Sequence, residues 1–331
     1  MIKRSKQTIL TVKSETNLTN FMTEKFSGMS RTSIKKLLQS GQICINGKPT
    51  TQYNYALHIG DTVLLNTGKV EYTLKDTRLK LLYEDDDLIV VDKSAGLLSV
   101  SVTADKKDTS AFQIIERYLK RKDPNAKLFV VHRLDKATSG VMMFVKNAEI
   151  QHLMRDNWKG YVTERTYIAM TEGVPYPFED TIESYLHENR RQTMYSELDG
   201  EDGNGKLSVT HYCVVRRTGK HALVKLNLET GRKNQIRVHM HDIGCPIVGD
   251  IKYGAQEESP IRRLGLHATT LSFTHPRTEE TLTFTSPLPR QFNSFMEKEY
   301  QEEKTKAQVK EEARQKKGLN RRTTDQRKKK D

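Results

Sequence analysis

The sequence predicts a protein of mixed α and β structure in three parts. Residues 1–66 combine helical and strand patterns, residues 79–300 alternate short apolar runs with amphipathic stretches, and residues 301–331 contain few apolar side chains. Between the first two parts, residues 67–78 lack a clear periodicity, which is typical of a linker. We therefore expect a small α/β domain, a larger domain of the α/β or α+β class, and a basic tail that is disordered because it cannot bury a core.

The small domain is expected to begin with two helices and to continue with a small sheet. Apolar residues recur at helical spacing over residues 18–26 and 34–38, and Gly41 follows the second run as a helix stop. Asn46-Gly47 is a two-residue hairpin signal. Strand patterns cover residues 43–45 and 60–65.

The larger domain contains both strand and helix candidates. Runs of apolar residues are typical of buried strands. Amphipathic spacing predicts helices over residues 112–119 and 147–160, the second of which opens at Asn147. The strand candidates are residues 81–83, 88–91, 129–131, 141–145, 167–170 and 224–228.

The charge distribution indicates a polyanionic partner. The net charge of +13 is concentrated at the ends, because residues 1–66 carry +6, residues 301–331 carry +6 and the residues between them carry only +1. Lysine and arginine that neutralise phosphates release counterions, which provides affinity that does not depend on sequence. An acidic membrane surface is the competing partner. No basic amphipathic helix with bulky apolar residues is evident, so we expect a nucleic acid.

The composition also bears on compartment, disulfides and metals. No apolar stretch approaches the roughly 20 residues that cross a bilayer, and the basic N-terminus lacks the apolar core of a secretory signal, so we expect a cytoplasmic protein. Cys44, Cys213 and Cys245 are too widely spaced for a disulfide framework or a zinc site. His239 and His241, expected on one face of a strand, form only a weak metal site. We therefore expect reduced cysteines and no metal.

One short polar turn lies between two apolar runs. His132-Arg133-Leu134-Asp135 follows residues 128–131, and Thr138-Ser139-Gly140 leads into residues 141–145. If the two runs are buried strands, a rigid scaffold positions the loop between them, and an enzyme can hold an acidic side chain in this way. From the pattern alone, an ordinary turn aspartate is the simpler interpretation, because Asp bonds its own backbone in turns.

The order of these residues resembles the signature of the RluA family of pseudouridine synthases. Other stretches are similar to further elements of that family, so that the resemblance covers roughly residues 15–295. These stretches are Leu88 to Lys93 with Gly96, Arg165-Thr166-Tyr167, residues 230–239, Gly249-Asp250 with Tyr253-Gly254, Leu266-His267-Ala268 and His275-Pro276. The sequence departs from the family pattern at Ser94, where proline is usual, and at Asn234, where histidine is usual.

The N-terminal part resembles a second family, the S-four-like RNA-binding domain. Arg31, Lys35 and Lys36 lie on or near its second expected helix. The alternative is a solvated helix whose lysines only aid solubility. The charge excess of the whole segment favours RNA binding.

The resemblance to the pseudouridine synthases implies a fold and a reaction. The fold is α+β, with a mixed and largely antiparallel sheet flanked by helices. The reaction converts uridine in RNA to pseudouridine: the bond between the sugar and the base nitrogen is broken, and the same sugar carbon is joined to carbon 5 of uracil. No electron, group or water is gained or lost overall. The resemblance therefore implies no cofactor and no metal.

The same resemblance implies roles for single residues. Asp135 occupies the catalytic position, as nucleophile or as base. Arg237 is the candidate guanidinium paired with Asp135, and Tyr167 is expected against the flipped base. Arg133, Arg165 and Arg232 are expected to bind RNA, whereas His132, Thr138 and Gly140 are expected to support the loop. Without the motif, Arg237 is an ordinary arginine facing solvent and Tyr167 a core tyrosine.

The sequence leaves several alternatives open. Large-subunit rRNA is the favoured substrate, and tRNA is the alternative, because the catalytic motifs do not encode which uridine is chosen. A ribosome-assembly factor that binds RNA but has lost its chemistry is suggested by Ser94 and Asn234, and the presence of Asp135, Tyr167 and Arg237 speaks against it. The related synthases of small-subunit rRNA typically have Gly-Arg-Leu-Asp where this chain has His132-Arg133-Leu134-Asp135, which favours the RluA type. We expect a monomer, although nothing in the sequence determines this.

Overall fold

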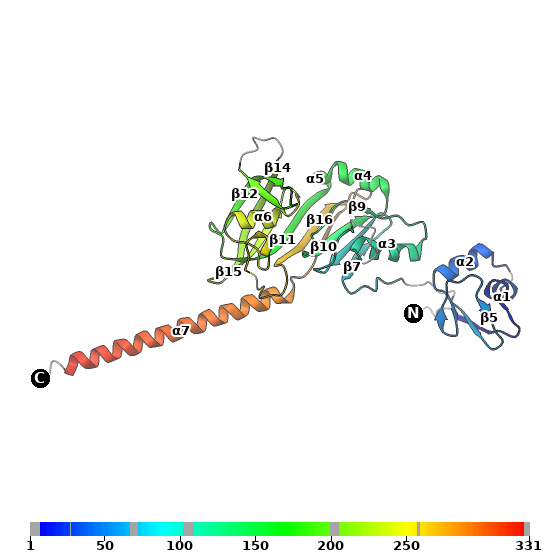
Figure 1. Ribbon diagram of the computed structural model, residues 1–331, viewed down its shortest axis with the longest axis horizontal. Helices are drawn as coiled ribbons and strands as arrows, with labels where there is room; N and C mark the ends of the chain where they lie inside the picture. The colour runs from blue at the N-terminus through cyan, green and yellow to red at the C-terminus, as the bar shows by residue number, and fades with distance from the viewer. Residues whose placement is uncertain are drawn as a thin grey trace. The chain divides into compact units, whose positions relative to one another are not determined.

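The computed structural model describes the chain over most of its length (Figure 1). The described residues are 7–26, 28–66, 72–101, 109–198, 205–256 and 259–327, with side chains described as far as residue 311. Part of the expected linker, residues 67–71, and the last residues of the tail, 328–331, therefore lie outside the described residues. The chain divides into two compact units, Met1–Lys75 with Ile114–Lys127, and Asp76–Gln113 with Leu128–Asp331.

The N-terminal residues of the first unit form two helices and two small sheets. Helix α1 (Leu18–Lys25) is capped by the Asn17 side chain, which accepts from the Asn20 N–H at 2.9 Å, and α2 (Arg31–Gln39) is capped by Ser30. Strands β1 (Gln7–Thr11), β6 (Thr62–Asn66), β3 (Ile43–Ile45) and β4 (Lys48–Pro49) form one sheet, in that order, and β2 (Thr16–Asn17) pairs with β5 (Ala56–Leu57). The expected helices and strands are confirmed.

The hairpin between β3 and β4 has the expected turn. Asn46 and Gly47 both have positive φ angles, of 49° and 77°, which a two-residue turn matching the twist of the strands requires. The buried side chains of both helices and the sheet, from Val12 to Leu65, form one core cluster. This part of the chain therefore has a hydrophobic core of its own.

The second unit is built on an 11-stranded sheet. Its strand order is β13-β12-β14-β15-β11-β16-β10-β8-β7, with β17 paired to β16 and β9 paired to β10. All of these pairs are antiparallel except β10 with β16, which is parallel. The expected α+β class with a mixed, largely antiparallel sheet is confirmed.

The strands of this sheet include all six candidates and five further strands. The strands that coincide with candidates are β7 (Leu79–Glu84), β8 (Leu88–Lys93), β9 (Phe129–Val130), β10 (Ser139–Val145), β11 (Val162–Glu172) and β15 (His221–Leu228). The further strands are β12 (Glu179–Glu188), β13 (Met194–Glu197), β14 (Lys206–Arg217), β16 (Leu266–Thr274) and β17 (Thr281–Thr285).

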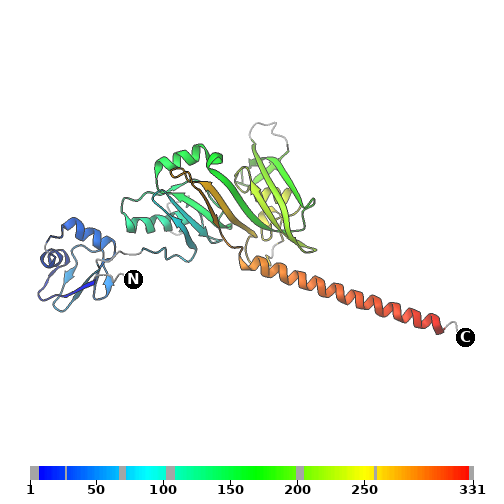
Figure 2. The ribbon, with the colours of Figure 1, turned by 180° about the vertical axis from the view of Figure 1, so that it is seen from behind.

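Both expected helices of the larger domain are present. The first is α3 (Ala111–Lys122), which belongs to the first compact unit from Ile114 onward. The second is interrupted, because Asn147 caps α4 (Ala148–Asp156) and Asn157 then caps a separate short helix, α5 (Trp158–Tyr161). Figure 2 shows the sheet and its helices from behind.

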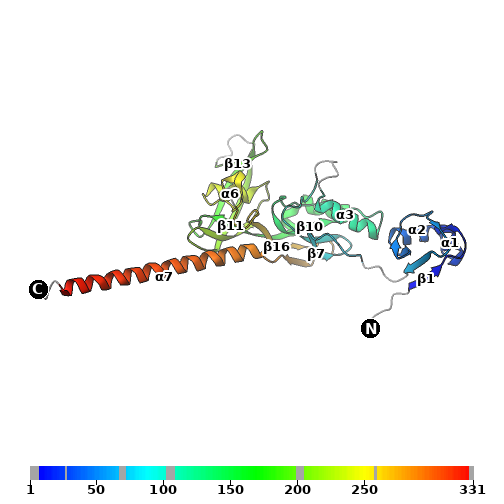
Figure 3. The same cartoon turned by 60° about the horizontal axis from the view of Figure 1, so that its bottom comes forward.

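Helix α6 (Gln235–Asp242) corrects one expectation. The sequence placed His239 and His241 on one face of a strand, but residues two apart on a helix point to different sides. His239 is buried and its ring contacts the hydroxyls of Ser184 and Thr210 at 3.0 and 2.9 Å, whereas His241 is exposed. Val238 of α6 packs against Met194 of β13, beside which the helix lies in Figure 3.

The chain ends in a long helix, α7 (Arg290–Arg327). Its first turns are anchored, because Phe292 and Met296 are fully buried and Glu297 pairs with Arg216 of β14 at 2.7 Å. From residue 300 to residue 311 the side chains are mostly exposed. Residues 301–331 were expected to be disordered, whereas helix α7 continues to Arg327. Residues 301–311 bury little apolar surface, as their composition predicts.

No helix among the described residues is both long enough and apolar enough to cross a membrane. The three cysteines are free thiols, with Cys245 buried and the other two partly buried.

Candidate active site

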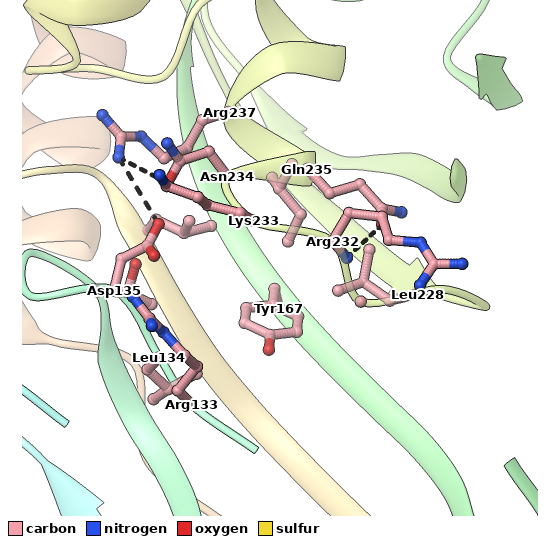
Figure 4. Close-up of a pocket in the computed structure, with 14 residues that line it drawn as sticks. Arg133, Leu134, Asp135, Tyr167, Leu228, Arg232, Lys233, Asn234, Gln235 and Arg237 are labelled. Carbon is pink, nitrogen blue, oxygen red and sulfur yellow. Dashed lines mark hydrogen bonds and ion pairs between the residues drawn. The ribbon is translucent and has the colours of Figure 1, made fainter. Parts of the chain in front are cut away.

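A cavity of about 200 Å³ opens beside the loop that joins β9 to β10. It is lined mainly by residues 133–138 of this loop, Tyr167 of β11 and residues 231–237 at the start of α6, with Leu228 and Leu266 completing the wall (Figure 4). Asp135 presents its carboxylate here, with about a quarter of the side chain exposed. The structure therefore brings Asp135, Tyr167 and Arg237 together, although they are far apart in the sequence.

A buried lysine holds the loop that carries Asp135. Lys93, at the end of β8, is fully buried, and its ammonium donates to the carbonyls of Thr138 at 2.6 Å and Leu97 at 2.8 Å. The carbonyls of Asp135 and Lys136 lie at 3.3 and 3.5 Å. Burial lowers the pKa of Lys93 to about 8, and the Asp135 carboxylate opposes this shift. In the sequence, Lys93 is recognisable only as the end of a motif, and its contacts with the loop carbonyls were not predicted.

Further hydrogen bonds hold the residues on either side of Asp135. The Ser99 hydroxyl donates to the Leu134 carbonyl at 2.6 Å and accepts from the Leu134 N–H at 3.1 Å. His132 accepts from the Met143 N–H through Nε2 at 3.0 Å. Burial lowers the pKa of His132 to about 3, so its ring is neutral at physiological pH. The Thr138 N–H closes the turn on the Asp135 carbonyl at 3.1 Å.

Gly140 is required by the approach of two strands. It has a φ of +117°, and a Cβ at this position would lie 2.0 Å from the Ala268 carbonyl oxygen. Gly140 and Ala268 are register partners in the parallel pair of β10 with β16. The Asp135 loop ends at this pair of strands. The loop can take its position only because Gly140 has no side chain.

Arg237 is held mainly by a carboxylate that the sequence analysis did not assign to it. Its guanidinium makes a bidentate pair with the buried Asp250, with both N–O distances at 2.7 Å. The remaining nitrogen, Nη1, lies 3.6 Å from the Asp135 carboxylate. The expected pairing of Arg237 with Asp135 is therefore the longer of two contacts, and Asp250 is the residue that orients the guanidinium. Asp250 raises the pKa of Arg237 against the opposing effect of burial.

The two departures from the family pattern both make hydrogen bonds. Asn234 has a left-handed φ of 54°, and its side chain accepts from Arg237 Nη1 at 3.2 Å and donates to the Tyr253 hydroxyl at 3.1 Å. The Ser94 N–H donates to the Arg78 carbonyl at 2.9 Å, which a proline could not do. Neither residue disrupts the arrangement around Asp135.

Tyr167 lies in the cavity between the Asp135 loop and Arg232 (Figure 4). Burial raises the pKa of its hydroxyl, and the Asp135 carboxylate adds to this shift, while Arg165 opposes it. Within the described part of the chain, no hydrogen bond involves this hydroxyl. A half-buried aromatic face with an open polar end can contact a planar base.

The residues expected to bind RNA fall into two groups. Arg133 and Arg232 are exposed at the mouth of the cavity, and Arg165 lies beside it, partly buried. Arg31, Lys35 and Lys36 are exposed on α2 of the N-terminal part. Among the described residues, no group of three or more His, Cys, Asp or Glu side chains could hold a metal ion.

Comparisons with known proteins identify two similar regions. A family model described as RNA pseudouridylate synthase matches residues 87–242, and a model of the S4 domain matches residues 17–63. The chain is 31% identical over 297 residues to ribosomal large subunit pseudouridine synthase D of Xanthomonas campestris, covering 83% of this chain and 86% of that protein. It is 32% identical over 243 residues to tRNA pseudouridine synthase C of Haemophilus ducreyi, covering 66% of this chain and 96% of that protein.

A solved structure agrees with these matches. Human RNA pseudouridylate synthase domain containing 4 superposes with a TM-score of 0.52 at 26% identity, covering 63% of this chain and 88% of that one.

Proposed function

This chain belongs to the RNA pseudouridine synthase family, and we propose that it converts selected uridines of large-subunit ribosomal RNA to pseudouridine. The observation that carries the proposal is the position of Asp135. Its loop is held by a buried lysine that binds main-chain carbonyls, and its carboxylate lies at the wall of a cavity, with a guanidinium at 3.6 Å and an aromatic ring in the same wall. An ordinary turn aspartate needs none of these supports.

The proposed reaction begins when a uridine leaves its stack and enters the cavity. Asp135 then acts on the sugar, either as a nucleophile or as a base that removes a proton from it. The bond between the sugar and the base nitrogen breaks, the base turns, and the same sugar carbon bonds to carbon 5 of uracil. The proton on carbon 5 is lost and the freed nitrogen gains one, so that atoms and electrons balance.

Five further side chains are proposed to assist this reaction. Arg237, oriented by Asp250, keeps the Asp135 carboxylate facing the sugar. Tyr167 supports the base, and its hydroxyl is available for removal of the proton from carbon 5. Arg133, Arg165 and Arg232 are proposed to contact the RNA backbone.

The N-terminal part is proposed to anchor the substrate. Its match to the S4 domain and the exposed cations Arg31, Lys35 and Lys36 support this role. The choice of large-subunit rRNA follows the large-subunit synthase from Xanthomonas campestris, whose match covers 83% of this chain. We further propose that the protein acts as a monomer in the cytoplasm.

Transfer RNA is a second candidate substrate. The Haemophilus ducreyi relative is a tRNA synthase, and its match covers only 66% of this chain. The match to the large-subunit synthase covers 83% of this chain, so the longer match favours ribosomal RNA, while the catalytic cavity is compatible with both.

Tritium release tests the proposal. Unmodified large-subunit rRNA transcripts and a tRNA pool, both labelled with tritium at carbon 5 of uridine, are incubated with the full chain. We expect release from the rRNA. Release from the tRNA pool alone would move the substrate to tRNA. No release from either pool, or from labelled ribosomal particles, would contradict the proposed activity and favour an assembly factor that only binds RNA.

A further inference from the structure

A second cavity, of about 410 Å³, adjoins the catalytic one. The two share Arg133, Tyr167, Leu228, Gly231 and Arg232 as walls, so they lie side by side. The walls that belong to the second cavity alone include Trp158, Lys159 and Arg165. A strand whose uridine enters the catalytic cavity has a covalently attached neighbour on each side. The adjoining cavity is therefore within reach of a neighbouring nucleotide.

Arg165 is a partly buried cation at this place. Its guanidinium donates to the Leu228 carbonyl at 3.1 Å, and among the described residues it has no carboxylate partner. Burial lowers its pKa, as expected for a charge removed from water without a counterion. A Cβ on Gly231 would lie 2.5 Å from Arg165 Nη1, so the glycine leaves the room that the guanidinium occupies. A partly buried arginine without a carboxylate partner is suited to pair with an anion that a ligand supplies.

The other charged residues around this cavity also favour an anionic ligand. Arg133, Lys159 and Arg232 are exposed at its rim. Glu229 is the acidic residue in its lining, and its carboxylate is already bonded to His211 Nε2 at 2.7 Å. The cavity is therefore suited to an anion, and a planar guanidinium can hold two oxygens of a phosphate at once.

Trp158 adds a surface for a base. It is the single tryptophan of the chain and is partly buried at the cavity wall. One contact of its ring is with His132, at a centroid distance of 5.3 Å. Aromatic side chains next to cations are the usual elements with which proteins bind unpaired nucleotides, because bases stack on rings while the backbone meets positive charge.

We infer that the cavity formed by Trp158, Lys159 and Arg165 binds the nucleotide adjacent to the target uridine, with its phosphate on Arg165 and its base against Trp158. The inference rests on the proposed function and adds a substrate subsite to it. It assigns to Arg165 a specific contact, with a single phosphate. It also assigns a role in binding to Trp158.

The salt dependence of binding tests the phosphate contact. The affinity of the full chain for a short oligouridylate is measured at several salt concentrations for the wild type, Arg165→Gln and Arg155→Gln. Loss of one phosphate contact on a single strand lowers the slope of log affinity against log salt by about 0.7. We expect this change for Arg165→Gln alone, because Arg155 lies on α4, is bonded to Asp156 and lines neither cavity. A weaker affinity with an unchanged slope would assign Arg165 a structural role and overturn the phosphate contact.

Tryptophan fluorescence tests the base contact. Because Trp158 is the single tryptophan, its emission reports on this cavity. Oligouridylate is expected to quench the emission, and less so in Arg165→Gln. Inorganic polyphosphate, which has the charge without bases, is expected to compete with the RNA without this quenching. Binding of oligouridylate without quenching, or equal quenching by polyphosphate, would overturn the base contact.

The tritium-release assay distinguishes a failure of this inference from a failure of the proposed function. Tritium release from rRNA by the wild type, combined with no effect of oligouridylate on Trp158 and no slope change in Arg165→Gln, would contradict the subsite alone. Absence of tritium release, combined with quenching and the slope change, would contradict the proposed reaction while supporting a nucleotide subsite.

Trp158→Leu should lower kcat/KM on the RNA that responds by about 5- to 150-fold, the range for stacking of one base. Trp158→Phe should retain most of it.

Discussion

Asp135 derives its proposed reactivity from its position at the cavity rather than from an unusual residue type. Its backbone is fixed by Lys93 and by the turn to Thr138, while its carboxylate faces the cavity and Arg237. Because the loop is fixed by main-chain contacts, the side chain can be changed without disturbing the scaffold.

Asp135→Asn is therefore expected to abolish turnover and to leave RNA affinity nearly intact. The amide keeps the shape of the carboxylate but can neither attack the sugar nor accept a proton from it at a useful rate. Tritium release measures turnover, and a filter-binding titration with the same RNA measures affinity. Full activity in this variant would remove Asp135 from the reaction.

Arg237→Met should destabilise the protein as well as inactivate it. The substitution leaves the Asp250 carboxylate, whose side chain is 1% exposed, without its bidentate partner. Removing one partner of a buried pair lowers the free energy of unfolding by about 3–5 kcal/mol. Urea denaturation measures the change. The double variant Arg237→Met/Asp250→Leu should recover part of the stability but not the activity, and a double variant no more stable than the single one would contradict this account.

At the scale of secondary-structure elements, the sequence was most informative where strands are buried on both faces. All seven residues of β10 are buried, so an unbroken apolar run marks the strand. Strand β12 opens with exposed polar residues and strand β17 has no buried residue, so neither contains the unbroken apolar run that marks a buried strand. Ile236, Val238 and Met240 alternate as in a strand, yet all three are buried in α6. Nearly all sides of this helix are packed, which removes the helical period from its sequence.

The candidate site was predicted only where a motif marked it. Asp135, Tyr167 and Arg237 were found through the resemblance, and the structure places them in one cavity. The pairing of Arg237 with Asp250 could not be read from the sequence, because it depends on how the loop after residue 249 folds back on α6. A buried lysine that binds carbonyl oxygens, such as Lys93, also leaves no local pattern in the sequence.

Gly140→Ala should disrupt the pairing of β10 with β16. The methyl group would overlap the Ala268 carbonyl, and the backbone at a φ of +117° is unfavourable for alanine. Gly244→Ala is the matched control, because Gly244 has a φ of +71° with open space around its Cβ position. We expect a loss of about 1–2 kcal/mol in the control from backbone strain alone. A larger loss is expected for Gly140→Ala, measured by thermal unfolding, and equal losses would show that the strands can separate freely.

Lys93 gives the protein a pH dependence of stability in the alkaline range. Its pKa is lowered to about 8 in the folded chain from 10.5, so between these values the unfolded chain binds more protons. The free energy of unfolding should therefore rise with pH across this window, by up to about 3 kcal/mol. The comparison is with Lys93→Met, which should lack this rise and lose activity as the loop carbonyls lose their donor. Parallel pH profiles of the two proteins would exclude Lys93 as the titrating group.

At the scale of the whole molecule, positive charge is concentrated at the two ends of the sequence, outside the segments that line the catalytic cavity. Residues 1–66 and 301–331 together carry +12 of the net +13, from the +6 on each segment. The substrate is a polyanion, so most of the non-specific attraction should come from the ends of the chain. The cavity then contributes the selection of a uridine and its chemistry.

Deletion of residues 1–66 should weaken RNA binding and flatten its salt dependence without destroying the catalytic domain. The deleted part has a core of its own, formed by residues from Val12 to Leu65, so its removal need not unfold the rest. Each phosphate contact that is lost lowers the slope of log affinity against log salt by about 0.7 to 0.9. Substituting Arg31, Lys35 and Lys36 by Gln in the intact chain should reproduce part of the change, whereas a deletion of residues 301–331 tests the tail separately. An unchanged slope after the first deletion would show that the N-terminal part is not the RNA anchor. The cations around the two cavities would then be the candidates for that role.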